Sequence, residues 1–285
     1  MRDDSAPRTP FFILEDGLFV PTKACRGYWR ADTLSGRVVG GLLGYVLERD
    51  FGGEGLVPVR FCVDLLRLAP RAPLKVETRT IKSGGRLILG EADLLAGDEL
   101  VARASCQFLR TSSAPAAPTW MTPGWNAPSP DDLPRDRASH WDMRPIPAGL
   151  AGPLRVPQAE AQGASAQPVS ANPPVLGDLS PVNARQAWVR ELRDLVDVAP
   201  LSPFTRIALA ADFASPLANS SLNSIDYVNS DFTVYLHRLP VSPWIGFELT
   251  RHHATDGVAI GECALHDETG PIGMVTAAGL AQRQR

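Results

Sequence analysis

The sequence has little that would tie it to a nucleic acid or a membrane. Its formal net charge is −3 over 285 residues and its isoelectric point is about 6.0. No excess of basic residues is therefore available for a phosphate backbone or an anionic lipid surface. The longest apolar runs have the length of a strand, well short of the ~20 residues that a membrane helix needs. We expect neither nucleic acid nor membrane among the partners of this protein.

Cysteine and secretion signals are also scarce. The four cysteines, Cys25, Cys62, Cys106 and Cys263, have no paired spacing. The amino terminus begins Met-Arg-Asp-Asp-Ser-Ala-Pro and carries no apolar run of the secretory type. These features predict reduced, structural thiols in a cytoplasmic protein.

Common catalytic motifs are missing as well. The sequence contains no glycine loop for phosphate binding, no cluster with metal-ligand spacing and no Gly-x-Ser-x-Gly nucleophile elbow. His252 and His253 are adjacent on a predicted strand and so point to opposite faces, which favours one exposed and one packed residue over a site. We therefore expect no cofactor and no metal.

What the sequence does contain is an internal repeat. Shifted by 171 positions, the segment 61–68 falls on 232–239 without a gap, and 90–94 falls on 261–265. Internal self-similarity fixes the architecture of a chain. It predicts one small domain that occurs twice, with the two copies packed as a pseudo-dimer and any shared site at their interface.

Each copy shows a helix followed by four strands. Apolar residues recur at helical spacing from Gly36 to Arg49, after a cap at Thr33 or Ser35. The other expected elements are strands at 11–28, 56–68, 74–82, 86–94 and 99–109, then a strand at 141–146, a helix at 200–214 and strands at 231–239, 244–252, 258–265 and 273–283. A buried helix clasped by an antiparallel sheet in this order is the hot-dog arrangement. We predict an α+β fold, a tandem (double) hot-dog.

The composition predicts the domain boundaries. We expect an N-terminal hot-dog domain at 1–112, a Pro-rich linker at 113–140 and a C-terminal hot-dog domain at 141–285. The segment 148–183 is rich in Pro, Gly, Gln and Ala, which predicts a low-complexity insertion within the second domain.

Differences between the copies indicate candidate site residues, because packing residues are kept in both copies whereas a site can survive in one. Asp212 interrupts the apolar helix of the second copy, where the first copy has Tyr45. A carboxylate on a buried helix is costly unless it is hydrogen-bonded or functional, or unless it reaches solvent at the helix end. Asn229 and Asp231 lead into the first repeated strand, where ordinary turn chemistry is the alternative explanation.

Four segments resemble a known family. The segment Leu34–Leu43, with its glycines, is similar to the helix start of the double hot-dog acyl-CoA thioesterases, the acyl-CoA thioesterase II family, and Asp142–Ile146 resembles the first strand of that family's second domain. Ala210-Ala211-Asp212, followed by Asn229-Ser-Asp-Phe-Thr-Val and a His-Arg pair that ends at Arg238, resembles the actinobacterial-type thioesterase-like branch. The resemblance covers the chain apart from the linker and the insertion.

The resemblance implies that Asp212 binds and activates water together with a Thr-type residue, whose position is Asn229, and a Gln in the last strand. The Gln position falls on Ala278, or on Ala277 after a shift of one residue. An alanine cannot hold water, and losing one polar contact of this kind costs on the order of 10² to 10³ in rate.

The implied function is hydrolysis of fatty acyl-CoA, with the thioester carbonyl at a helix amino terminus and Asp231 as an auxiliary to the base. Gly40 and Gly41 would let the substrate approach the backbone closely; tight helix packing explains them equally well. The resemblance thus implies acyl-CoA as the partner of this protein. Whether two copies of the double hot-dog chain form a homodimer stays open.

Two other functions stay open. An acyl-CoA or acyl-carrier binding protein of the same fold is favoured by Ala278. A hot-dog hydratase would need a histidine paired with a carboxylate near the helix, and neither predicted helix carries a histidine. Gln107 stands opposite Ala278 in the first copy, but that copy has Tyr45 where a carboxylate is needed.

Overall fold

The computed structural model describes residues 8–117, 120–122, 124–136, 141–153, 185–220 and 225–282. The predicted insertion at 148–183 lies outside the described residues beyond position 153, and so does part of the predicted linker at 113–140. We propose that the boundary between the two copies falls within that linker.

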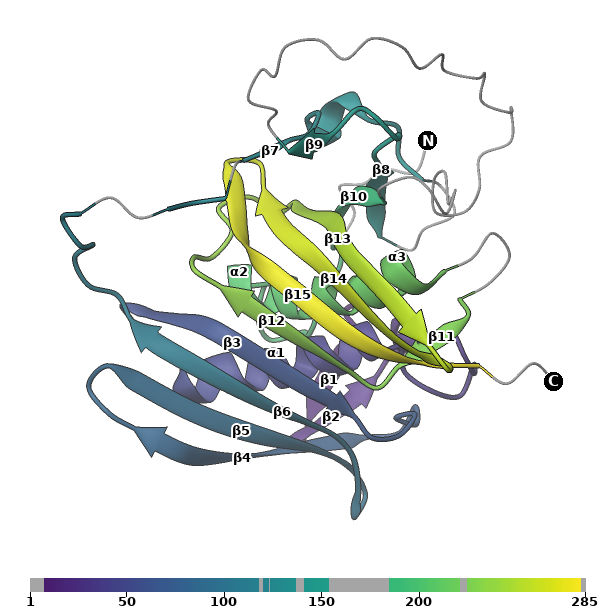
Figure 1. The fold of residues 1–285 in the computed structure, drawn as a ribbon. Helices are drawn as coiled ribbons and strands as arrows, with labels where there is room; N and C mark the ends of the chain where they lie inside the picture. Colours follow the sequence, from purple (N-terminus) through teal and green to yellow (C-terminus); the bar gives the residue numbers. More distant parts are fainter. Residues whose placement is uncertain are drawn as a thin grey trace, which may run out of the picture.

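One antiparallel sheet joins both copies (Figure 1). Its strands follow one another in the order β1 (Phe12–Glu15), β2 (Leu18–Pro21), β4 (Leu74–Ser83), β5 (Leu87–Ala96), β6 (Glu99–Arg110), β3 (Leu56–Leu65), β12 (Asp231–Leu236), β15 (Gly270–Ala281), β14 (Val258–Asp267), β13 (Ile245–Thr255), β10 (Gln186–Arg190) and β8 (Asp142–Pro145). A further strand, β11 (Tyr227–Asn229), also pairs with β15, and β7 (Trp125–Asn126) pairs separately with β9 (Gly152–Pro153). The order predicted for both copies is thus confirmed, whereas the strands β7, β9, β10 and β11 were not predicted from the sequence.

The central strand pair carries the symmetry of the repeat. In the register of β3 with β12, Cys62 lies opposite Thr233, and the Cys62 Sγ atom is 3.0 Å from Thr233 Oγ1. These two residues are 171 positions apart, the offset of the repeat. On either side, Phe61 pairs with Val234 and Val63 with Phe232, so exchanging the copies leaves the pairing unchanged. A pseudo-two-fold axis therefore passes through the Cys62–Thr233 pair.

The helices lie on one face of the sheet (Figure 1). They are α1 (Gly36–Phe51), α2 (Pro203–Ala210), the short 3-10 turn η3 (Ala211–Phe213) and α3 (Ala214–Asn219); two further 3-10 turns are η1 (Lys23–Cys25) and η2 (Pro130–Asp132). The second predicted helix is thus three consecutive segments. The positions Ser35 and Ser202 precede α1 and α2 as their N-caps.

The two main helices pack against each other in opposite directions at short range. A Cβ atom added to Gly40 would lie 2.5 Å from the Phe232 ring and 3.3 Å from the Ala208 carbonyl oxygen. At Gly44 it would lie 2.5 Å from the Ala208 Cβ atom. Glycines on α1 therefore allow the backbones to approach closely, and each helix begins where the other copy's helix ends.

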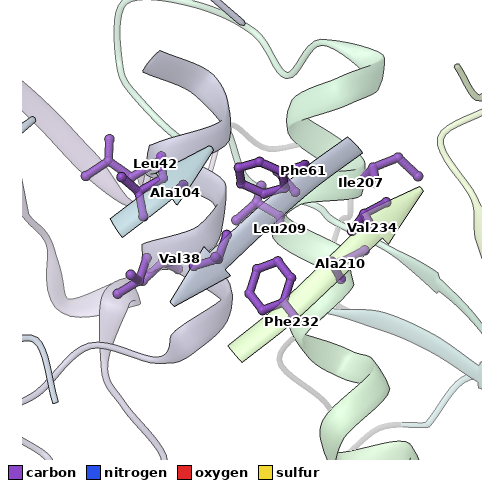
Figure 2. Packing of buried hydrophobic residues seen from close by; sticks show 14 of the residues in the cluster. Val38, Leu42, Phe61, Ala104, Ile207, Leu209, Ala210, Phe232 and Val234 are labelled. Atoms are coloured by element: carbon purple, nitrogen blue, oxygen red, sulfur yellow. The ribbon is translucent and has the colours of Figure 1, made fainter. Parts of the chain in front are cut away.

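Aromatic rings fill the space between these helices and the sheet (Figure 2). The Phe61 ring lies edge to face with Phe204 and with Phe232, at centroid distances of 5.5 and 6.0 Å. Val38 and Leu42 of α1 belong to the same fully buried cluster. Since one core spans both copies, the copies form a single packed unit.

Candidate active site at the start of the first helix

The Asp212 carboxylate lies against the first turn of α1. The Asn229 side-chain amide donates a hydrogen bond to its Oδ1 atom at 2.8 Å, and the backbone N–H of Arg37 donates to the same carboxylate. A Cβ atom added to Gly36 would lie only 2.7 Å from Asp212 Oδ1 and 3.0 Å from Oδ2. The structure thus brings Asp212 and Asn229 together. The beginning of α1, a helix of the other copy, is the third part of this site.

The antiparallel packing of α1 and α2 explains this meeting. The end of the second copy's helix reaches the beginning of α1, so η3 presents Asp212 to it. The first N–H groups of a helix have no partner within the helix, and Ser35 makes no side-chain cap hydrogen bond. A carboxylate at this end is also stabilised by the helix dipole. Asp212 therefore supplies, from the other copy, the acceptor that α1 lacks.

Asp212 is half-buried, and its carboxylate is partly desolvated. Burial raises the pKa of this carboxyl group above its ordinary value, whereas the hydrogen bond from Asn229, the charge of Arg37 and the Arg37 N–H act in the opposite direction. A carboxylate with a raised pKa and well-placed donors is suited to accept a proton near neutral pH.

A backbone irregularity aims Asn229 at the site. Asn229 ends β11 opposite Gly279, Asp231 begins β12, and Ser230 between them interrupts the strand. The first copy has the matching irregularity, since its register shifts between Pro58 and Arg60. There, however, the position of Asn229 is a proline, which has no side-chain amide. Bulges of this kind re-aim a side chain, and only the second copy places an amide on it.

Asp231 has different partners. Its Oδ1 atom accepts hydrogen bonds from the Ala278 N–H at 3.0 Å and from the Ser230 hydroxyl at 3.3 Å. The carboxylate therefore joins the interruption between β11 and β12 to the backbone of β15, and its hydrogen bonds do not include Asp212. This favours the turn explanation for Asp231.

Gly40 and Gly41 lie elsewhere, in the interface between the helices. A Cβ atom on Gly41 would lie 2.6 Å from the Leu209 side chain, and both glycines are buried. Their surroundings favour the packing explanation. Gly36 is the glycine that lies at the candidate site, and the sequence analysis did not select it. A signal existed: Gly36 directly follows the N-cap Ser35, whereas Pro203 follows the N-cap of the other helix.

The alternation of side chains along β15 separates Ala277 from Ala278. Val275 and Ala277 are 0% and 2% exposed and face the helices, whereas Ala278 is half-buried and faces the other side. Ala277 thus shares the helix face of the sheet, and Ala278 does not.

The two-fold mate of the site is built differently. Around the start of α2, the Glu48 Oε2 atom accepts hydrogen bonds from the Ser202 hydroxyl and, at 3.2 Å, from the Thr205 hydroxyl. Ser202 also accepts the Thr205 N–H at 2.9 Å, so α2 is capped by its own residue. Burial raises the pKa of Glu48, and the two hydroxyls oppose this rise. The first copy therefore has a carboxylate too, but it is satisfied by side-chain hydroxyls.

Fold and site together define the class of protein: two hot-dog units in tandem, with a carboxylate of one copy held at the helix start of the other. Solved structures share this fold. The tesB protein of Mycobacterium avium subsp. paratuberculosis is 14% identical with a TM-score of 0.62, and the match covers 98% of this chain and 96% of that one. The acyl-CoA thioesterase II TesB2 of Mycobacterium marinum is 17% identical with a TM-score of 0.61, and 94% of each chain is covered.

A conserved protein of unknown function with a hot dog fold, from Alicyclobacillus acidocaldarius, is 15% identical with a TM-score of 0.65, and 95% of each chain is covered. Residues 128–280 match the family model of the acyl-CoA thioesterase C-terminal domain. The chain belongs to this acyl-CoA thioesterase family. No curated protein matches the sequence. None of the helices in the described part of the chain has the length and apolarity of a membrane span.

Proposed function

We propose that this protein is a thioesterase that hydrolyses the thioester bond of fatty acyl-CoA, with Asp212 as general base. The observation that carries the proposal is the Asp212 carboxylate itself, which is half-buried, bound by the Asn229 amide at 2.8 Å and placed at the start of α1. Family membership supplies the reaction class.

The geometry supports a direct hydrolysis. The thioester carbonyl oxygen would bind at the first turn of α1, where the positive end of the helix dipole stabilises negative charge. Asp212 would take a proton from a water molecule, and the water oxygen would form a bond to the carbonyl carbon. When the tetrahedral intermediate collapses, the carbon–sulfur bond breaks and the proton on Asp212 passes to the leaving thiolate.

The position of Asp212 at the helix start supports this chemistry. A base and a set of oxyanion donors should both lie about 3 Å from the reacting atoms. Asp212 already contacts the N–H of Arg37, so the base lies directly at the start of α1. Asn229 would hold the attacking water in place of the family's polar pair, because Ala277 and Ala278 offer no polar side chain.

The alternative is a binding protein for acyl-CoA or an acyl-carrier. The missing glutamine favours this function, since Ala277 lies on the helix face of β15 and leaves the water with one side-chain partner fewer. In such a protein the thioester would bind at α1 and persist.

Release of free thiol from acyl-CoAs of increasing chain length separates the two functions. We expect wild-type turnover and its loss in Asp212→Asn, with Asp231→Asn as the matched control. The Asp231→Asn side chain keeps an oxygen for the Ala278 N–H, so turnover should persist. Saturable binding without thiol release by the wild-type protein would support the binding function instead.

The Asp212→Asn variant also has a testable effect on stability. Because the pKa of Asp212 is raised in the folded state, the folded protein holds a proton that the unfolded chain releases, and stability falls as the pH rises through this range. The asparagine removes this cost. We expect a higher melting temperature for the variant at pH 7 and a smaller difference at pH 4; a lower melting temperature at pH 7 would contradict the buried charge.

A further inference from the structure

Arg37 is the residue whose N–H faces Asp212, and its own side chain is held from three sides. The guanidinium lies over the Trp141 ring at 4.6 Å and over the Phe11 ring at 5.0 Å, and its Nη1 atom forms an ion pair with Glu191. Only 16% of the side chain is exposed. Stacking and ion pairing together fix a side chain that is otherwise flexible.

Glu191 is itself anchored. Its side chain is 3% exposed, and its Oε1 atom accepts the backbone N–H groups of Leu192 and Arg193 at 2.9 and 3.0 Å. The loop that follows β10 therefore has a fixed carboxylate pointing at α1. Phe11 belongs to the first copy, whereas Trp141 and Glu191 belong to the second, so the Arg37 side chain joins the copies beside the site.

We propose that Arg37 is a positioning residue for the Asp212 site: its clamped side chain fixes the first turn of α1 against Asp212, and its positive charge, shared with Glu191, keeps the Asp212 carboxylate ionised. This inference rests on the proposed function, because it assigns Arg37 a part in preparing the base.

The charged groups around Asp212 support this assignment. The elements packed against η3 contribute Arg37 from α1, Arg206 from α2 and Asp231 from β12. The negative charges of Asp194 and Glu191 act on Arg206, and the Asp231 carboxylate accepts the Ala278 N–H of β15. Among the described residues, Arg37 is the cation that opposes the rise in the pKa of Asp212.

The ion pair gives two substitutions with opposite expected effects. Arg37→Gln removes the positive charge, so protonation of Asp212 becomes easier and the acid limb of the pH profile should move to higher pH. Glu191→Gln removes the negative charge that is paired with Arg37. The positive charge of Arg37 then acts more strongly on Asp212, so the acid limb should move to lower pH. The Gln oxygen can still accept the two loop N–H groups that Glu191 holds. A role in packing alone would not shift the limb in opposite directions.

The test is the pH dependence of kcat/KM for one acyl-CoA, measured on the full chain for wild type, Arg37→Gln, Arg37→Lys and Glu191→Gln. Misplacement of the Arg37 N–H can also lower the plateau by up to about 10²-fold, so the position of the limb is the deciding readout. Arg37→Lys keeps the charge and should restore the limb to the wild-type position even if the plateau stays low.

A second readout does not depend on turnover. The ¹³C chemical shift of the Asp212 carboxyl, assigned by its absence in Asp212→Asn, reports its protonation directly in the same proteins. Opposite shifts in the two glutamine variants and rescue by lysine are the expected result. Equal shifts, no shift, or a lysine variant that behaves like Arg37→Gln would overturn the proposal. If wild type shows no thiol release, the proposed function fails, and the NMR titration still decides the role of Arg37.

Discussion

Replacing Gly36 by alanine would test the geometry of the site with a single methyl group. The new carbon would lie 2.7 Å from Asp212 Oδ1, whereas ordinary contact begins at 3.4 Å, so the carboxylate must move by about 0.7 Å. The movement would disturb the 2.8 Å hydrogen bond from Asn229. A misplacement of this order at a reacting group costs about 10²-fold in rate, and we expect at least that loss in kcat/KM.

The same substitution should leave the fold intact. Gly36 stands in the first turn of α1, where alanine is the better helix former by no more than about 1 kcal/mol. The atoms it meets belong to the end of the Asp212 side chain, which can move. The melting temperature should therefore stay level or rise slightly.

Gly44→Ala is the matched control on the same helix. Its new carbon would lie 2.5 Å from the Ala208 Cβ atom, in the interface of the two helices. Overpacking of this kind costs about 1–3 kcal/mol of stability, and the residue is two turns away from Gly36. We expect a lower melting temperature with turnover per folded molecule preserved.

The assay is thiol release from a good acyl-CoA substrate, beside thermal unfolding of both variants. Gly36→Ala should lose activity and keep stability, and Gly44→Ala should do the reverse. Wild-type turnover in a folded Gly36→Ala protein would show that neither Asp212 nor the thioester carbonyl uses the start of α1.

Two further predictions concern stability. Asp267 accepts two 2.7 Å hydrogen bonds from Arg238, which hold the pKa of its carboxyl well below the usual range; Asp267→Asn weakens these charged hydrogen bonds and should cost about 2 kcal/mol in urea unfolding at pH 7. Because that pKa is lowered, the difference should vanish as the pH falls through the carboxyl range, and a constant difference would contradict the ion pair. The buried His266 ring stacks on Trp125 at 4.4 Å, and neither nitrogen has a hydrogen-bond partner, while Glu248 lies 3.5 Å from Nε2. His266→Phe should keep or raise the melting temperature; a clear drop would mean that a charged pair with Glu248 stabilises the fold.

Much of the fold could be predicted from the sequence, because the sequence signals for its elements are local or repeated. The offset of 171 predicted two equivalent copies, and the register of Cys62 with Thr233 has the same offset. Helical spacing and Ser35 located the start of α1 at Gly36. The end of the second helix was harder to predict from the sequence, because η3 and α3 continue the helix without a change in composition. The strand β10 was missed because it follows directly on the low-complexity segment.

For the candidate site, too, some features could be predicted from the sequence and others required the structure. Asp212 and Asn229 could be selected because they break the equivalence of the copies, and resemblance supplied their expected roles. Asp231 was selected by the same rule, yet its contacts with Ala278 and Ser230 favour a structural part. The choice between Ala277 and Ala278 needed the pleat of β15, because a one-residue shift reverses the face of a strand.

The sequence by itself determined the duplicated hot-dog fold, the presence of one unmatched carboxylate on a buried helix and the absence of the family's glutamine. The tertiary structure decided what that carboxylate touches. Gly36 and Asp212 are far apart in the chain, and they meet because α1 and α2 pack in opposite directions over small residues. Glu48 meets Ser202 for the same reason. The physical cause is that helical periodicity fixes the buried face of each helix, whereas the closeness and direction of two packed helices depend on both partners at once.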